Sequence, residues 1–200
     1  MIIECLEKQN YYIPKTFLEI GANHPYNLSC SWYLEKALGF KGVLIEPQSK
    51  FIEVFSELRP NTVFINKALV PHKYDNKYKV LFEANIDVLS SIDEHEVEVM
   101  RQMGYKFQKN INLISTKDLE RHFGERIGIL IIDIESFRLQ IEILREIINM
   151  RLKPFIICVE TLDFSTTSKS LRHDFDELLR DMYAFEAGTY LNSIYIYRGA

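Results

Sequence analysis

The sequence has few cysteines, no long hydrophobic run and no excess of positive charge. Its 200 residues include three cysteines, none in a C-x-x-C pair, which argues against a disulfide framework and against a structural zinc site. No run of about 18 apolar residues occurs, so we expect no membrane span. The formal net charge is -4 with acids and bases interspersed, which disfavours electrostatic binding to a nucleic-acid backbone.

The start of the sequence, MIIECLEKQNYY, lacks the basic-then-apolar order of a secretory signal, so we expect a cytoplasmic protein. Hydrophobic residues make up 47% and charged residues 26%, which is ordinary for a globular protein. The length suits one sizeable core and is short for two. We therefore expect a single domain over residues 1–200, with an N-terminal extension at 1–15 and a less regular insert at 71–116.

Apolar runs that stop at glycine or proline alternate with segments of helical periodicity in the first third of the chain. This β-α-β-α-β order within about 50 residues predicts a parallel sheet with crossover helices. The predicted strands are TFLEI (16–20), GVLIEP (42–47) and TVFINKALV (62–70), and the predicted helices are 28–38 and 49–60.

The second half of the chain continues the pattern after an irregular middle and ends in two runs separated by a glycine-containing turn. That ending predicts an antiparallel hairpin. The fold class is therefore α/β, with a mostly parallel central sheet, a C-terminal antiparallel hairpin and helices on both faces. Further strands are predicted at 78–84, 110–116, 127–135, 154–160, 183–190 and 191–199, and further helices at 93–104, 117–125, 139–152 and 171–182.

Glycine is scarce where a dinucleotide-binding loop would need it. After the first strand comes Gly21, but Asn23 and Tyr26 occupy the later glycine positions of the G-x-G-x-x-G fingerprint. Glu46 follows the second strand, 25 positions after Gly21, where an acid can accept both ribose hydroxyls of a nucleoside. The pairing favours an adenosine ligand. The competing interpretation is a structural glycine turn beside an ordinary surface glutamate.

Residues 17–69, from FLEIGANHPYNLSC to NTVFINKAL, resemble the first half of FkbM-type S-adenosylmethionine-dependent methyltransferases. Three later pieces fit the same pattern in the same order: LSSID at 89–93, ISTKDL at 114–119 and IGILIIDIE at 127–135. The resemblance implies a Rossmann-like methyltransferase fold. It also implies methyl transfer, usually to the oxygen of a sugar, a glycan or a related small metabolite, with the insert at 71–116 shaping the acceptor site.

The resemblance implies a role for individual residues at the ends of the strands. Asp133 would lie near the methyl group, as the first candidate for a general base, with Glu135 second and His95 a distant third. The competing interpretation is that Asp133 is a structural or cofactor-orienting acid. The acceptor would meet His24, Ser91 and Arg138. The residues implied for the cofactor are Glu19, Gly21 and Asn23 at its methionine end, Glu46 at the ribose, Asn66 and Ala68 beside the adenine, and Asp133 near the methyl group.

The sequence departs from the family pattern directly after Asp133. The family continues Asp-x-Glu with Gly-x-Glu, whereas this chain has Ser136 and Arg138 at those two positions. Both changes fall where the acceptor should arrive. Arg138 would favour an anionic acceptor by charge pairing, and the competing interpretation is an exposed helix arginine.

Other functions stay open at this point. A non-catalytic binding protein is consistent with the altered segment after Asp133, and an NAD-type oxidoreductase is disfavoured by the missing glycines and the terminal hairpin. The sequence indicates no metal site, although Asp133, Glu135 and Glu160 would offer oxygen ligands to a divalent cation if they converged. The expected partner is a small-molecule or glycan acceptor and not nucleic acid, for a monomer or a homodimer.

Overall fold

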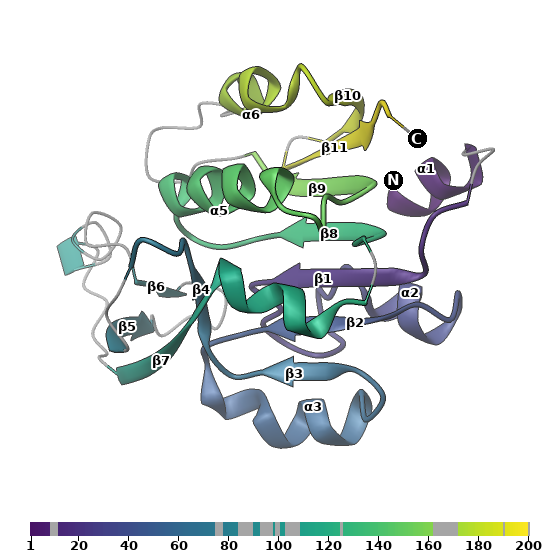
Figure 1. The fold of residues 1–200 in the computed structure, drawn as a ribbon. Helices are drawn as coiled ribbons and strands as arrows, with labels where there is room; N and C mark the ends of the chain where they lie inside the picture. Colours follow the sequence, from purple (N-terminus) through teal and green to yellow (C-terminus); the bar gives the residue numbers. More distant parts are fainter. Residues whose placement is uncertain are drawn as a thin grey trace.

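Figure 1 shows the protein as a computed structural model. The structure describes residues 1–8, 12–74, 78–83, 90–92, 98, 101–102, 109–124, 126–161, 172–189 and 191–199. No helix among these residues is long and apolar enough to cross a membrane.

A seven-stranded sheet forms the centre of the molecule, in the order β10-β11-β9-β8-β1-β2-β3. Strands β3, β2, β1, β8 and β9 run parallel, and β11 pairs antiparallel with both β9 and β10. The prediction of a mostly parallel sheet that ends in an antiparallel hairpin is confirmed. The strands are β1 (Thr16–Ile20), β2 (Lys41–Ile45), β3 (Val63–Ile65), β8 (Ile129–Ile132), β9 (Ile156–Glu160), β10 (Tyr183–Gly188) and β11 (Asn192–Tyr197).

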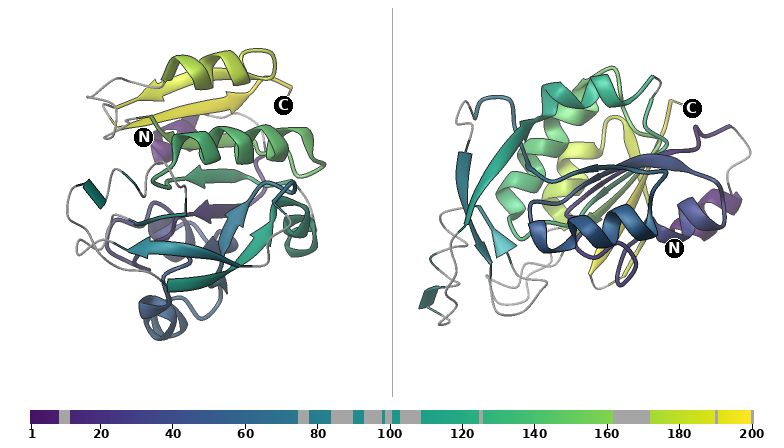
Figure 2. Two further views of the ribbon diagram at one scale, coloured as in Figure 1. Left: turned by 90° about the vertical axis from the view of Figure 1, so that its left-hand side faces the viewer. Right: turned by 90° about the horizontal axis from the view of Figure 1, so that it is seen from below.

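Helices cover both faces of this sheet, as Figure 2 shows. Helices α5 and α6 pack on one face and α1, α2 and α3 on the other, so that two hydrophobic cores lie on either side of the strands. In β1, Leu18 and Ile20 enter the first core and Phe17 enters the second, which is why the strand is apolar on both sides. The helices are α1 (Ile2–Lys8), α2 (Trp32–Lys36), α3 (Ile52–Leu58), α5 (Phe137–Asn149) and α6 (Arg172–Leu179), with 3-10 turns η1 (Ser49–Phe51) and η2 (Thr116–His122).

A second sheet of four strands, β4-β7-β5-β6, lies beyond the arrowheads of the parallel strands in Figure 1. It is built largely from the stretch predicted as a less regular insert. Strand β4 runs parallel to β7, and β5 pairs antiparallel with β6 and β7. The strands are β4 (Ala68–Val70), β5 (Tyr78–Glu83), β6 (Ser90–Ser91) and β7 (Lys109–Ser115).

The prediction of a single strand over 62–70 is wrong. The chain leaves the main sheet after β3 and enters the second sheet as β4. A tight turn separates them, because Lys67 N donates to Ile65 O and the Asn66 side chain donates to Glu46 O. A run of apolar residues does not reveal such a change of sheet, because β4 is buried and β3 is half-buried except at Val63, so both halves are apolar strands.

The predicted helix over 28–38 is much shorter in the structure, where α2 covers Trp32–Lys36. Leu28, the first residue of the predicted helix, has a positive φ angle of 64°, which is incompatible with a right-handed helix at that position. The helix predicted at 93–104 lies mostly outside the described residues.

The second sheet is joined to the first core by a carboxylate on α5. Glu146 accepts hydrogen bonds from His72 N, from His72 Nδ1 and from the Thr116 hydroxyl. Burial opposes the ionisation of Glu146, but the bonds from Thr116 and His72 outweigh it and hold the pKa of Glu146 below its ordinary value. The ionised carboxylate therefore stabilises the junction between the two sheets.

We expect Glu146→Gln to destabilise the protein at neutral pH and to lose that effect in acid. Because the folded-state pKa of Glu146 is lowered, its stabilisation is present above the ordinary value of 4.5 and is lost as the pH falls through the folded value. Urea unfolding of wild type and variant from pH 7 down to pH 3 measures the difference. Glu177→Gln, an exposed change on α6, serves as the control. A difference that stays constant across this range would contradict the assignment.

Candidate functional site

The candidate site lies at the edge of the main sheet where the parallel strands end. Gly21 follows β1, Glu46 follows β2, Asn66 follows β3 and Asp133 follows β8. Parallel strands place their carboxyl ends at one edge, so four of the residues predicted from the sequence are brought there together. The hydrogen bonds described below show how they are connected.

Gly21 packs directly against the backbone that follows β8. Its φ angle is +82°, and a Cβ atom built there would lie 1.8 Å from the carbonyl oxygen of Asp133. Asp133 N in turn donates to Ile20 O and continues the ladder between the two strands. The glycine is therefore required for the close approach of two strand ends, whatever ligand the edge binds.

Glu46 joins the ends of β1 and β2. Its carboxylate accepts hydrogen bonds from Asn23 N and from Gln48 N, both at 2.8 Å. The carbonyl oxygen of the same residue accepts from Nδ2 of Asn66, at 2.9 Å. Glu46 is 3% exposed, so the carboxylate is both buried and oriented by backbone donors. The turn after β1, the end of β2 and the end of β3 thus form one hydrogen-bonded unit.

Glu19 has a different environment from the one that the resemblance implied. It points into the second core from the middle of the sheet and is 3% exposed. Its carboxylate accepts from Cys30 N and from the hydroxyls of Ser29 and Ser31. Glu19 therefore anchors residues 29–31 behind β1.

Arg59 extends this arrangement into a buried charge network. Its guanidinium donates from Nη1 to Ser29 and from Nη2 to Ser31, and it lies 3.8 Å from Glu19. Nε donates to Glu35 at 2.6 Å. The arginine side chain is 1% exposed, so its charge is balanced almost entirely by these protein groups.

Glu35 connects the charge network to the start of strand β3. It also accepts from the hydroxyl of Thr62, just before β3. Burial opposes its ionisation, but the bonds from Thr62 and Arg59 hold the pKa of Glu35 below its ordinary value. The network thus ties β1, α2 and the start of β3 together.

Asp133 lies beside a second carboxyl, that of Glu160 at the end of β9, and is hydrogen-bonded to it. Solvent reaches the Asp133 side chain. Even so, the surrounding protein raises its pKa by burial, and the bond from Glu160 partly opposes that increase. The carboxyl is open to solvent on one side and enclosed by protein on the others. The thiol of Cys30 lies in the same region, and burial, Glu19 and Asp133 raise its pKa to about 12.

The residues predicted to meet the acceptor come from three different segments, the turn after β1, strand β6 and helix α5. His24 organises its own turn, since Nδ1 accepts from Tyr26 N at 3.1 Å and from Asn27 N at 3.0 Å. In a neutral ring this leaves the proton on Nε2. Ser91 lies in β6, where its backbone pairs with Phe82, and its side chain is outside the described part of the structure.

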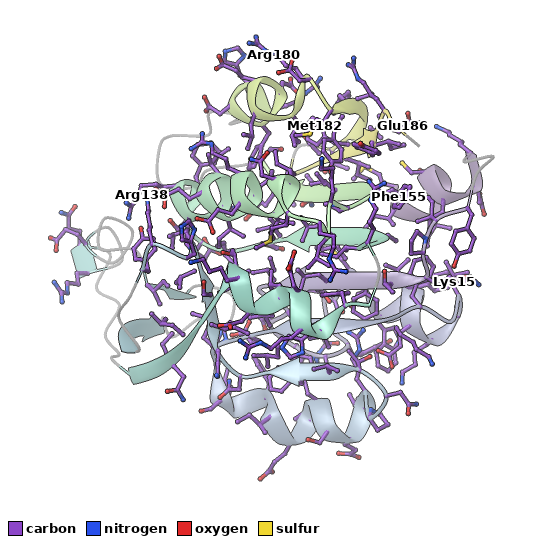
Figure 3. The ribbon with its side chains drawn as sticks, in the orientation of Figure 1. Lys15, Arg138, Phe155, Arg180, Met182 and Glu186 are labelled. Carbon is purple, nitrogen blue, oxygen red and sulfur yellow. The ribbon has the colours of Figure 1, made fainter. Side chains whose placement is uncertain are left out.

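Arg138 is exposed on the first turn of α5. Figure 3 shows it on the side where β1 and β8 end, whereas Lys15 and Phe155 lie at the opposite edge of the sheet. Ser136 is buried and caps α5, because its hydroxyl accepts from Leu139 N. The serine that departs from the family pattern therefore has a structural role.

Glu135, Ala68 and His95 are the other residues that the resemblance implied. Glu135 is half-buried between Asp133 and the cap of α5, and Ala68 is buried at the start of β4 in the second sheet. His95 lies outside the described residues. Within the described part of the chain, no three His, Cys, Asp or Glu side chains are grouped so that they could hold a metal ion.

Sequence reasoning missed Arg59 and its serine partners, and it gave Glu160 no role other than as a candidate metal ligand. One signal was present for Arg59. A glutamate within a buried strand needs a cation or several donors, and so Glu19 itself predicts a buried partner. Nothing in the sequence shows that the partner is Arg59.

Comparison with proteins of known structure identifies the fold. The fibrillarin pre-rRNA processing protein of Methanococcus jannaschii is similar to this chain, with a TM-score of 0.51 and 12% identity over 98% of this chain and 73% of that one. This chain has the Rossmann-like methyltransferase fold. A fibrillarin/Nop5p complex aligns with a TM-score of 0.48 and 15% identity over 98% of this chain and 78% of that one. No protein-family model matches the sequence, and no curated protein matches it.

Three glycine substitutions separate backbone strain from steric overlap in this methyltransferase fold. Gly124→Ala meets no atom within 4 Å and should change the free energy of unfolding by less than about 1 kcal/mol. Gly39→Ala has the same free space but a φ of +71°, and should destabilise by roughly 1–2 kcal/mol. Gly21→Ala adds the overlap with Asp133 and should destabilise by about 1–3 kcal/mol more than Gly39→Ala. Thermal unfolding measures all three, and equal effects for Gly21 and Gly39 would refute the close packing.

We expect Arg59→Met to lower the free energy of unfolding by about 3–5 kcal/mol, because it leaves Glu19 and Glu35 buried without their cation. Urea denaturation measures the loss. The matched control is Arg180→Met, whose side chain is 70% exposed and which should change stability by less than about 0.5 kcal/mol. Similar values for the two variants would show that the network contributes little.

Proposed function

We propose that the protein is an S-adenosylmethionine-dependent methyltransferase that methylates a hydroxyl group of a sugar, a glycan or a related small metabolite. The observation that carries this proposal is the bond from Asn23 N to the Glu46 carboxylate, on a sheet of the methyltransferase type. It joins the glycine turn after β1 to the acid after β2, the two strand ends that a nucleoside would bridge. The resemblance to FkbM-type enzymes supports the same activity.

The residues at this edge suit such a cofactor in their chemistry. Glu46 is a carboxylate held in place by backbone donors, which suits it to accept from ribose hydroxyls. Gly21 and Asn23 would follow the methionine end, and Asn66 and Ala68 would lie beside the adenine. Glu19 would act indirectly in this arrangement, since its described bonds hold residues 29–31.

When bound, S-adenosylmethionine supplies an electrophilic methyl group on a positively charged sulfur. The protein's task is then to hold the acceptor oxygen in line and to receive its proton. Asp133 is the proposed base. Burial raises the pKa of its carboxyl, and a general base accepts a proton more readily as its pKa approaches the pH of the reaction. Glu135, two residues further along, is the second candidate.

The acceptor would approach from the side of the second sheet and the first turn of α5. Arg138 is exposed there and would favour an acceptor that carries a carboxylate or a phosphate. His24 and Ser91 are the other proposed contacts. The proposal is thus a small-molecule or glycan acceptor, and it includes no metal.

Titration calorimetry with S-adenosylmethionine, S-adenosylhomocysteine and NAD tests the cofactor assignment. We expect both adenosyl ligands to bind and NAD to bind far more weakly, because the chain lacks the later glycines of a pyrophosphate loop. Tight binding of NAD alone would refute the proposal. Binding of S-adenosylmethionine with no turnover across a broad panel of hydroxyl acceptors would favour a non-catalytic binding protein.

The ribose contact has its own test. We expect Glu46→Gln to weaken S-adenosylhomocysteine binding by about tenfold or more, the effect of losing a charge-assisted hydrogen bond. Glu53→Gln, an exposed change on α3, should leave affinity unchanged. Both variants are first compared with wild type by thermal unfolding, so that a loss of folding is recognised. Unchanged affinity in a folded Glu46→Gln protein would place the ribose elsewhere.

A further inference from the structure

Asp133 and Glu160 meet because β8 and β9 are parallel neighbours. Their register pairs Ile132 with Val159, so the next residue of each chain is one of the two acids. Side chains alternate along a strand, and Ile131 and Cys158 both enter the second core. The two carboxyls therefore leave the sheet on the same face, and they are hydrogen-bonded to each other.

A hydrogen bond between two carboxyl groups requires a proton. Ionised carboxylates are acceptors only, so a pair that has lost both protons repels and cannot form this bond. The placement of Asp133 and Glu160 at neighbouring strand ends therefore favours a state in which the pair holds one proton. Such a pair titrates in two separate steps that belong to both groups together.

Burial favours the protonated form of Asp133, because it raises the pKa of that carboxyl. The thiols of Cys30, in the loop after β1, and of Cys158, on β9, lie in the same region, and burial together with the charge of Asp133 raises the pKa of both. Among the described residues, Glu160 is the sole charged or polar group that shifts the pKa of Asp133, the other cause being burial.

The backbone of Asp133 is also fixed. Its N–H is bonded to Ile20 O, and Gly21 packs against its carbonyl oxygen. Movement of the Asp133 carboxyl is therefore limited to its own short side chain. A neighbour that bonds to one of its oxygens decides which way the other oxygen faces.

We propose that Glu160 is a positioning residue for Asp133: the two carboxyls share one proton, which Glu160 donates, so that Asp133 is kept ionised and oriented to receive a proton. The part of this inference in which Asp133 receives the proton of the acceptor rests on the proposed function. The O–H bond of the acceptor breaks, its electron pair stays on oxygen, and the proton binds to Asp133. The pair then carries two protons and releases one to solvent before the next turnover.

Carboxyl NMR on protein labelled with ¹³C at the Asp and Glu side-chain carboxyls tests the shared proton without cofactor or acceptor. In the wild type we expect the Asp133 and Glu160 signals each to titrate in the same two steps. In Glu160→Gln, Asp133 should titrate in one step, and the step at higher pH should be absent. Glu160→Asp, which keeps the carboxyl, and Glu57→Gln, an exposed change on α3, should both keep two steps.

Independent single steps for Asp133 and Glu160 in the wild type would overturn the proposal, even if no variant folded. The same holds if the Asp133 titration were identical in Glu160→Gln and Glu57→Gln. Two steps in a protein that binds no S-adenosylmethionine would retain the proton pair and reject the proposed function. Cofactor binding together with independent single steps would retain the proposed function and reject the shared proton.

A kinetic measurement then tests the positioning role. On an acceptor that the wild type methylates, Glu160→Gln should move the pH profile of kcat and leave the KM for S-adenosylmethionine within about twofold. Glu57→Gln should reproduce the wild-type profile. Superimposable profiles for all three proteins would show that Glu160 does not act through Asp133.

Discussion

The arrangement of the candidate site depends on one buried cation. Arg59 lies between Glu19 and Glu35, with two serine hydroxyls relaying its charge to Glu19. A carboxylate in the middle of a buried strand is unfavourable unless its charge is balanced. Arg59 and residues 29–31 provide that balance, and their bonds to Glu19 fix the chain just before α2 to β1. The turn that meets Glu46 is supported from behind by this network.

Most of the fold could be predicted from the sequence because apolar runs and their terminators act locally. The parallel strands, the long α5 and the antiparallel ending all follow from periodicity and from glycine or proline boundaries. The division of residues 62–70 between two sheets did not, since it depends on hydrogen bonds of Asn66 and Lys67 with distant or neighbouring backbone. The residue just before α2, Ser31, likewise has a partner 28 positions away, Arg59, which local periodicity does not reveal.

For the candidate site, the sequence predicted positions better than environments. It placed Gly21, Glu46, Asn66 and Asp133 at strand ends, and the topology brings those ends to one edge. It did not distinguish Glu19, whose described partners are structural, from Glu46, whose partners are the backbone of the glycine turn. Nor did it show that Glu160 would be the neighbour of Asp133. Both facts depend on which strands pair, and the local spacing of residues does not determine how distant strands pair.

The position of β8 has a consequence for the nascent chain. Strand β1 is completed on one side by β2, which follows it closely, and on the other by β8, with Thr16 and Gly128 separated by 112 positions. During synthesis, one edge of β1 therefore stays unpaired until the ribosome has made the whole second sheet and then β8. At about 5–20 residues per second, that interval lasts several seconds or more. Until the last parallel strands emerge, this edge presents unpaired backbone N–H and C=O groups that can pair with another strand.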